Sequence, residues 1–132
     1  MAKRGRPKGS GKKISGKGCR TKGHAFERWC AIQFQKVFPL AKRHLEYQME
    51  EVQGIDLDNT GEYKVQCKRG KRYSSLSSIK EVQLCPIDGG VPVLVTKGDH
   101  ETPLACLPLS DFLKLLQAEK ELAELHATGS II

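Results

Sequence analysis

Two short runs of alternating apolar and polar residues, joined by a turn, lie near the middle of the chain. They form the segment GIDLDNTGEYKVQCK, residues 54–68. Because successive side chains of a β-strand point to opposite faces, the apolar residues of both runs fall on a single face. That face comprises Ile55, Leu57, Tyr63, Val65 and Cys67. The pattern predicts two paired strands, the second at Tyr63–Arg69, with one face buried in a core.

The opposite face of this strand pair carries polar side chains. A turn at residues 59–61 would place Asp56 opposite Lys64 and leave Gln66 as a diagonal neighbour of Asp56, about 7–8 Å away. A divalent cation with oxygen ligands at roughly 2.0–2.6 Å could bridge Asp56 and Gln66 after small adjustments. The alternative interpretation is a solvated sheet face, which the same alternation commonly produces.

A helix is predicted from His24 to about Phe38. At about 100° per residue its apolar side chains form one arc, and Glu27 falls inside that arc. The arc consists of Phe26, Cys30, Phe34, Val37 and Phe38. A carboxylate on the buried side of a helix is costly unless it is paired or bound to a metal ion. Glu27 is therefore a candidate metal ligand, and the alternatives are a structural salt bridge or a favourable position near the helix N-terminus.

The remaining elements complete an α/β pattern. Val93–Lys97 is typical of a buried strand, and Leu104–Leu107 of a further strand. Ser78–Glu81 matches a helix capping box, and Ser110 can cap a final helix. The apolar stripe of that final helix comprises Phe112, Leu115, Leu116, Leu122 and Leu125. The predicted order is helix, three strands, helix, two strands, helix, which is a mixed sheet with helices available for both faces.

Positive charge is concentrated at the N-terminus. The chain has 132 residues and a formal net charge of +7, from 22 Lys and Arg residues and 15 Asp and Glu residues. Nine of the 22 basic residues lie within residues 1–22, where there is no acidic residue. Such a segment cannot bury enough apolar surface to offset the entropy of ordering, so residues 1–22 are predicted to be disordered when free. Residues 23–132 are predicted to form one domain with a modest core.

This basic tail contains a DNA-binding motif. The sequence RGRP at residues 4–7 matches the core of an AT-hook, in which two arginines enter the narrow minor groove of A·T-rich DNA. The alternative is a generic basic arm that binds phosphates through counterion release. Either interpretation predicts nucleic acid as the partner. The DNA-binding candidates in the tail are Arg4, Arg6, Lys8, Lys12 and Lys13.

A second basic run follows the strand Tyr63–Arg69, directly beyond the candidate metal ligands. Clustered cations beside an acidic metal site suit a substrate that carries phosphates. The DNA-binding candidates in this run are Arg69, Lys71, Arg72 and Tyr73, which follow Lys68.

The cysteines and the hydropathy of the sequence indicate the cellular compartment of the protein. The five cysteines show no CxxC or Cys/His spacing, which argues against a zinc site and against a secreted disulfide framework. The basic N-terminus is not followed by the apolar segment of a signal peptide. No apolar run approaches the roughly 20 residues that span a bilayer. We expect an intracellular protein, cytoplasmic or associated with the nucleoid, with no membrane partner and no small-molecule cofactor.

Three short motifs resemble the PD-(D/E)XK nuclease superfamily. GHAFERW contains Glu27 on the first predicted helix, and GIDL contains Asp56 on the second strand. VQCKR contains Gln66 and Lys68 on the third strand. GIDL and VQCKR are most similar to Mrr-like restriction endonucleases, and KGHAFER is similar to the opening of archaeal-type and phage Holliday junction resolvases. The likeness covers roughly residues 23–100 and implies a restriction-endonuclease-like fold of element order αβββαββα.

The resemblance also implies a role for each motif residue. Asp56 would be the metal-bridging carboxylate, Gln66 would bind through its side-chain carbonyl, and Glu27 would bind through water. Lys68 would orient or activate the attacking water and neutralise charge on the phosphate. The implied cofactor is Mg²⁺, with Mn²⁺ as a substitute. Gln66 departs from the usual Glu, and Glu27 and Asp56 would therefore hold most of the charge of the ion.

The function implied by the resemblance is that of a divalent-metal-dependent DNA endonuclease. The Mrr-like enzymes carry a separate target-recognition domain, for which this chain has no room. The favoured substrate is therefore branched DNA, cut by a homodimer as in the junction resolvases. The alternatives are an Mrr-like enzyme that cuts duplex DNA and an inactive nuclease-fold protein that only binds DNA.

Overall fold

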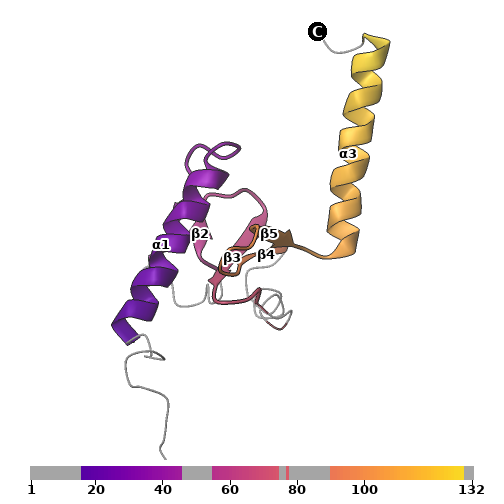
Figure 1. Ribbon diagram of the computed structural model, residues 1–132. Helices are drawn as coiled ribbons and strands as arrows, with labels where there is room; N and C mark the ends of the chain where they lie inside the picture. The colour runs from indigo at the N-terminus through magenta and orange to yellow at the C-terminus, as the bar shows by residue number, and fades with distance from the viewer. Residues whose placement is uncertain (1–15, 46–54, 75–76, 78–89, 130–132) are drawn as a thin grey trace, which may run out of the picture.

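The described part of the chain is a mixed α/β structure. The computed structural model describes residues 16–45, 55–74, 77 and 90–129, with side chains from Lys22 onward. Within these residues there are two helices and two small sheets (Figure 1). The elements are α1 (Gly16–Phe34), β1 (Lys42–Arg43), β2 (Leu57–Asp58), β3 (Tyr63–Arg69), β4 (Val91–Lys97), β5 (Leu104–Cys106) and α3 (Leu109–Thr128).

β4 is the central strand of the larger sheet, whose strand order is β3-β4-β5. β3 runs parallel to β4 with Gln66 beside Leu94, and β5 runs antiparallel to β4 with Val95 beside Ala105. A parallel pair requires a long crossover connection. That connection contains residues 78–89, so the helix predicted from Ser78 lies outside the described residues. β1 and β2 form a separate antiparallel pair.

The core lies between α1 and one face of the larger sheet. Its buried cluster consists of Phe26, Cys30, Ala31, Leu57, Val65, Cys67, Val93 and Val95. The alternation of residues 55–67 predicted this face correctly: Ile55 and Leu57 are buried, as are Val65 and Cys67, and Tyr63 packs against the cluster. Burial of each large apolar side chain in this cluster contributes about 1.5–3 kcal/mol to the stability of the fold. The core therefore ties α1 to both β2 and β3.

Asp56 joins the two sheets through its backbone. Its N–H donates to the carbonyl of Val65 at 2.8 Å, and its carbonyl accepts the N–H of His44 at 2.8 Å. The prediction that the two runs pair as neighbouring strands of one sheet is wrong: β2 pairs with β1, and a backbone hydrogen bond from Asp56 to Val65 connects this segment to β3. The connection between β2 and β3, residues 59–62, contains two residues with positive φ, Asn59 (62°) and Gly61 (64°).

Helix α1 is displaced toward the N-terminus relative to the prediction. It begins at Gly16 instead of His24, so residues 16–22, predicted to be disordered, are helical. Lys22 on this added part lies 3.7 Å from Asp99, a tertiary contact that favours its extension. The helix ends at Phe34 instead of Phe38. Its final carbonyl accepts the N–H groups of residues 37 and 38, and Pro39 disfavours helical geometry just before it.

Helix α3 stands away from the rest of the molecule (Figure 1). The predicted cap at Ser110 is wrong, because the N-cap position is Pro108 and no side chain caps the helix. Gly129 ends it in the left-handed conformation (φ 72°). No residue of α3 is buried, so its predicted apolar stripe is left open to solvent. Among the described residues, no helix is long and apolar enough to cross a membrane.

Candidate functional site

Asp56 is the centre of the candidate site. The strand junction holds its backbone, and its Oδ2 accepts the backbone N–H of Cys67 at 2.7 Å. The pKa of Asp56 is raised from 3.8 to about 6, mainly by burial and also by the nearby charge of Glu27. The Cys67 hydrogen bond and the charges of Lys68 and His44 act in the opposite direction. A cation bound beside a carboxylate in this environment stabilises its charged form.

Gln66 is buried, with 3% of its surface exposed. This excludes the solvated sheet face that the sequence left open for this residue. Its Oε1 is buried and accepts no hydrogen bond from the described residues. A buried polar atom without a partner costs about 1–3 kcal/mol, so this oxygen is suited to a cation or a donor group.

Glu27 projects from α1 toward the β1–β2 pair. Its side chain is 17% exposed, and its Oε1 lies 3.5 Å from Nη1 of Arg43. The ion pair that the sequence left as an alternative is therefore present. Glu27 is also close enough to raise the pKa of Asp56. The charge of Glu27 therefore acts on both Arg43 and Asp56.

Lys68 lies two residues after Gln66, on the same face of β3, and is partly buried. Its positive charge lowers the pKa of Asp56, which places it within electrostatic range of that carboxylate. The structure thus brings Glu27 and Lys68 close to Asp56, with Gln66 on the adjoining strand.

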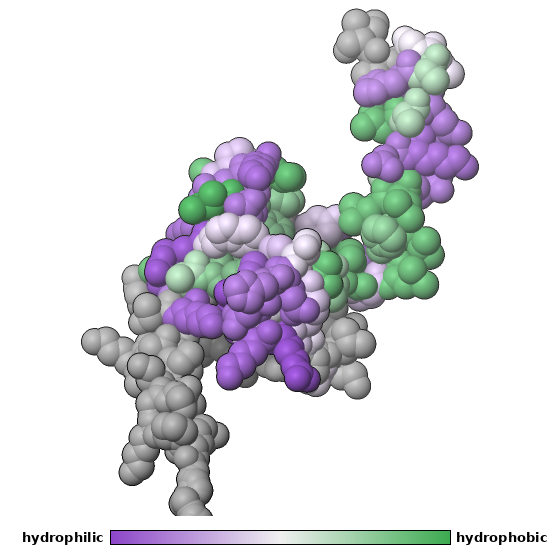
Figure 2. Space-filling view, in the orientation of Figure 1, coloured by the Kyte–Doolittle hydropathy of each residue, from purple (hydrophilic) through white to green (hydrophobic). Residues whose placement is uncertain are grey.

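The basic segment after β3 divides into fixed and exposed side chains. Arg69 donates to the carbonyl of Gly98 at 3.1 Å and lies 3.3 Å from the Asp99 carboxylate. The hydroxyl of Tyr73 donates to the carbonyl of Thr102 at 2.6 Å. Lys71 and Arg72 are exposed, and hydrophilic side chains gather low on the body near this segment (Figure 2). These two residues remain the accessible phosphate-binding candidates of the run.

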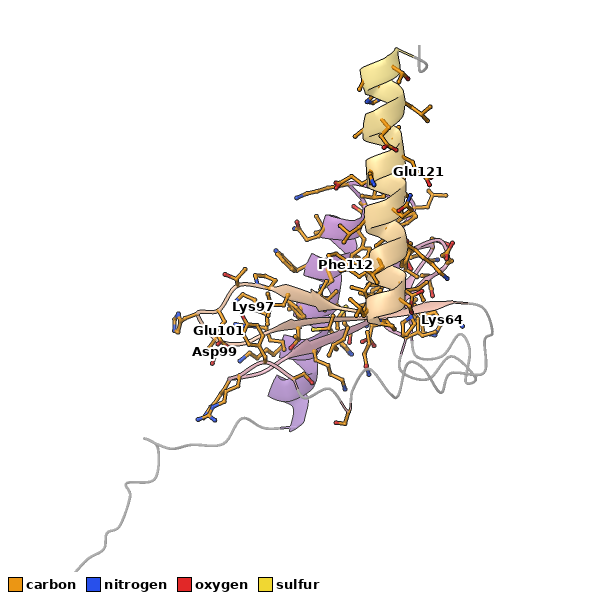
Figure 3. All side chains as sticks on the ribbon, turned by 90° about the vertical axis from the view of Figure 1, so that its right-hand side faces the viewer. Lys64, Lys97, Asp99, Glu101, Phe112 and Glu121 are labelled. Carbon is orange, nitrogen blue, oxygen red and sulfur yellow. The ribbon has the colours of Figure 1, made fainter. Side chains whose placement is uncertain are left out.

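Asp99 anchors this basic segment to the turn between β4 and β5. It lies within 3.7 Å of both Arg69 and Lys22, and its N–H donates to the carbonyl of Lys71 at 3.1 Å. Figure 3 shows Lys97, Asp99 and Glu101 together at one end of the larger sheet, with Lys64 at the other. The tail candidates from Arg4 to Lys13 lie outside the described residues.

Two site residues were missed by the sequence. Nδ1 of His44 lies 2.9 Å from Oδ1 of Asp58, and Arg43 contacts Glu27. The four histidines of the sequence show no metal-ligand spacing that would have pointed to His44. Both contacts depend on the pairing of β1 with β2, and a strand of two residues gives no periodic signal.

The groups near Asp56 that could bind a metal ion are of different chemical types. Among the described residues, no group of three or more His, Cys, Asp and Glu side chains is gathered as for a metal ion. The candidate donors instead combine the Asp56 carboxylate with the Gln66 amide oxygen, both of which suit a hard cation. No family model matches the chain, and no match was found among curated proteins or solved structures.

Asp56→Asn should stabilise the metal-free protein at neutral pH. The pKa of the Asp56 carboxyl is about 6 in the folded protein and 3.8 in the unfolded chain. The stabilisation that comes from its bound proton is therefore complete below pH 3.8 and is lost as the pH rises to about 6. Asparagine keeps a carbonyl for the Cys67 N–H but carries no charge. By urea denaturation in EDTA, the variant should gain up to about 3 kcal/mol over the wild type between about pH 4 and pH 7.

The matched control is Glu124→Gln on the exposed surface of α3. Its stability relative to the wild type should stay constant over the same pH range. If the difference in unfolding free energy between Asp56→Asn and the wild type were also independent of pH, a buried charge at Asp56 would be contradicted.

Proposed function

We propose that this protein is a divalent-metal-dependent DNA endonuclease with a restriction-endonuclease-like fold. One observation carries the proposal: the buried, unpartnered oxygen of Gln66 adjoins the strand of Asp56, whose carboxylate is raised in pKa by burial. The motif resemblance of Glu27, Asp56 and Lys68 supports the same function, because Glu27 and Lys68 both act electrostatically on Asp56. The residues present fit a hard cation such as Mg²⁺, with Mn²⁺ as a substitute.

Each residue of the candidate site would have a separate role in phosphodiester hydrolysis. Asp56 and Gln66 would hold the ion, and Glu27, which pairs with Arg43 on the α1 side of the strands, would reach it only through bridging water. When bound, the ion polarises the phosphoryl group and lowers the pKa of its water. Lys68 would orient the attacking water and neutralise charge that develops on the phosphate. Lys71 and Arg72 would contact the flanking phosphates, which positions DNA without reading its sequence.

We favour branched DNA as the substrate. The exposed cations near the site suit recognition of backbone shape, since phosphate contacts carry no base information. The two rival functions, cleavage of ordinary duplex and binding without cleavage, are outcomes of the same assay.

Asp56→Ala and Lys68→Ala should each abolish cleavage while DNA binding is largely kept. The assay compares linear duplex, single strand, flap and four-way junction in Mg²⁺ and in Mn²⁺. Lys64→Ala is the matched control, because Lys64 lies on the same strand and face but at its far end (Figure 3). Preference for the junction supports the proposal. A wild type that binds every substrate but cuts none in either metal would leave only the DNA-binding function.

Deleting residues 1–15 should flatten the salt dependence of DNA binding while α1 stays intact. The deletion removes six basic residues, so the slope of log K against log salt should fall by up to about 5. A chain in which residues 1–15 are scrambled is the control: it should keep the slope, and it loses preference for A·T-rich DNA if RGRP is an AT-hook. An unchanged slope after deletion would exclude the tail as the main phosphate contact.

The open apolar face of α3 supports the homodimer that symmetric cleavage requires. Leu115, Ala118, Leu122 and Leu125 follow one another at spacings of three and four residues, the pattern of a coiled-coil seam. In an antiparallel pairing with a second copy, Leu115 meets Leu125 and Ala118 meets Leu122. Each contact occurs twice, as two-fold symmetry demands. We therefore propose a second copy of this chain as the occupant of this face.

Leu122→Glu should convert the dimer to a monomer. In light scattering coupled to size exclusion, the wild type should give twice the chain mass of 14.7 kDa and the variant 14.7 kDa. Lys120→Glu places the same side chain on the opposite side of α3 and should stay dimeric. A wild type that is monomeric at every concentration tested would refute the pairing.

A further inference from the structure

His44 lies directly beside Asp56 on the neighbouring strand. Arg43 pairs with Leu57 in the antiparallel β1–β2 register, and the next position is joined by the 2.8 Å hydrogen bond from the His44 N–H to the Asp56 carbonyl. Residues opposite each other in an antiparallel pair project from the same face. The His44 and Asp56 side chains therefore belong to one face of this strand pair.

That face is the one turned away from α1. Leu57 belongs to the core under α1, and Arg43 reaches Glu27 on that helix. By alternation, the residues next to them project to the other side. Gln66 does the same on β3, since its neighbours Val65 and Cys67 are core residues.

The imidazole of His44 is held by Asp58. Nδ1 lies 2.9 Å from Oδ1 of Asp58, and the His44 side chain is only 9% exposed. A carboxylate accepts a hydrogen bond, so Nδ1 carries a proton, and in the neutral imidazole, the form that binds a metal ion, Nε2 then carries the lone pair. Nε2 is buried and has no hydrogen-bond partner among the described residues.

Two buried acceptor atoms thus flank Asp56, one on each side. Nε2 of His44 is on the β1 side and Oε1 of Gln66 on the β3 side, and neither receives a donor from the described part of the chain. Because both are acceptors, they cannot satisfy each other. A cation bound beside the Asp56 carboxylate and within reach of both atoms would satisfy all three groups.

We propose that His44 is a metal ligand through Nε2 and that Asp58 is its positioning residue. The inference rests on the metal site of the proposed function and extends it from an all-oxygen site to a mixed nitrogen and oxygen site. Imidazole suits transition-metal ions, whereas Mg²⁺ prefers oxygen alone. The site therefore prefers Mn²⁺ to Mg²⁺, and the carboxylate behind the histidine is the usual support of such a ligand.

The test is pulsed electron paramagnetic resonance of the full-length protein loaded with Mn²⁺. The wild type should show electron spin echo modulation from a directly bound ¹⁴N nucleus, and labelling with ¹⁵N-histidine should replace it with the ¹⁵N pattern. His44→Gln should remove the modulation and weaken Mn²⁺ binding. Asp58→Asn should keep the modulation and weaken Mn²⁺ binding by roughly 10–100-fold. His126→Gln, on exposed α3, is the matched control and should change neither.

The outcomes separate this inference from the proposed function. If Mn²⁺ binds the wild type without histidine modulation, the role of His44 is refuted and the Asp56 and Gln66 site stands. If neither Mn²⁺ nor Mg²⁺ binds, as measured by titration calorimetry, the metal site and the role of His44 both fail. The wild-type spectrum with histidine labelling decides the point even where His44→Gln does not fold.

Discussion

The burial of Asp56 at the junction of two sheets is the constraint on which the other features depend. Its backbone donates to β3 and accepts from the residue after β1, so a single residue links the two sheets. Its carboxylate accepts a hydrogen bond from the Cys67 N–H. Burial of this carboxylate is the main cause of its raised pKa of about 6. A carboxylate held this way is unfavourable at neutral pH unless positive charge is supplied. The surroundings supply it only in part, because the charge of Lys68 is opposed by that of Glu27.

The core and the candidate site lie on opposite sides of the same strands. Apolar residues facing α1 fix the strands, and the alternate residues then fall on the other face, where Gln66 and His44 keep buried acceptor atoms without donors among the described residues. The same strand continues into a segment that Asp99 holds in place. The apolar residues therefore form the core, and the candidate site consists of the polar residues on the other side of the strands.

Much of this arrangement could be predicted from local pattern. The alternation in residues 55–67 identified the buried face, and it placed Gln66 and Lys68 together on the other. The pairing of β2 with β1 instead of β3 could not be predicted, because β1 has only two residues and shows no periodic pattern. The contacts of Arg43 and His44 were also missed, since they join residues 14–16 positions apart through a strand too short to show a period. The stripe of α3 was predicted, but its exposure is a property of packing that no pattern encodes.

The central claim is that a divalent cation binds at Asp56 on the face opposite α1. The most direct measurement is paramagnetic broadening of backbone amide resonances in the ¹⁵N-labelled protein as Mn²⁺ is added in substoichiometric amounts. The amides of residues 55–58 and 66–68 should broaden first, while those of α3 remain sharp, and Asp56→Asn should remove the effect. Uniform broadening across the chain, or broadening centred on another acidic cluster such as the C-terminal half of α3, would contradict the account.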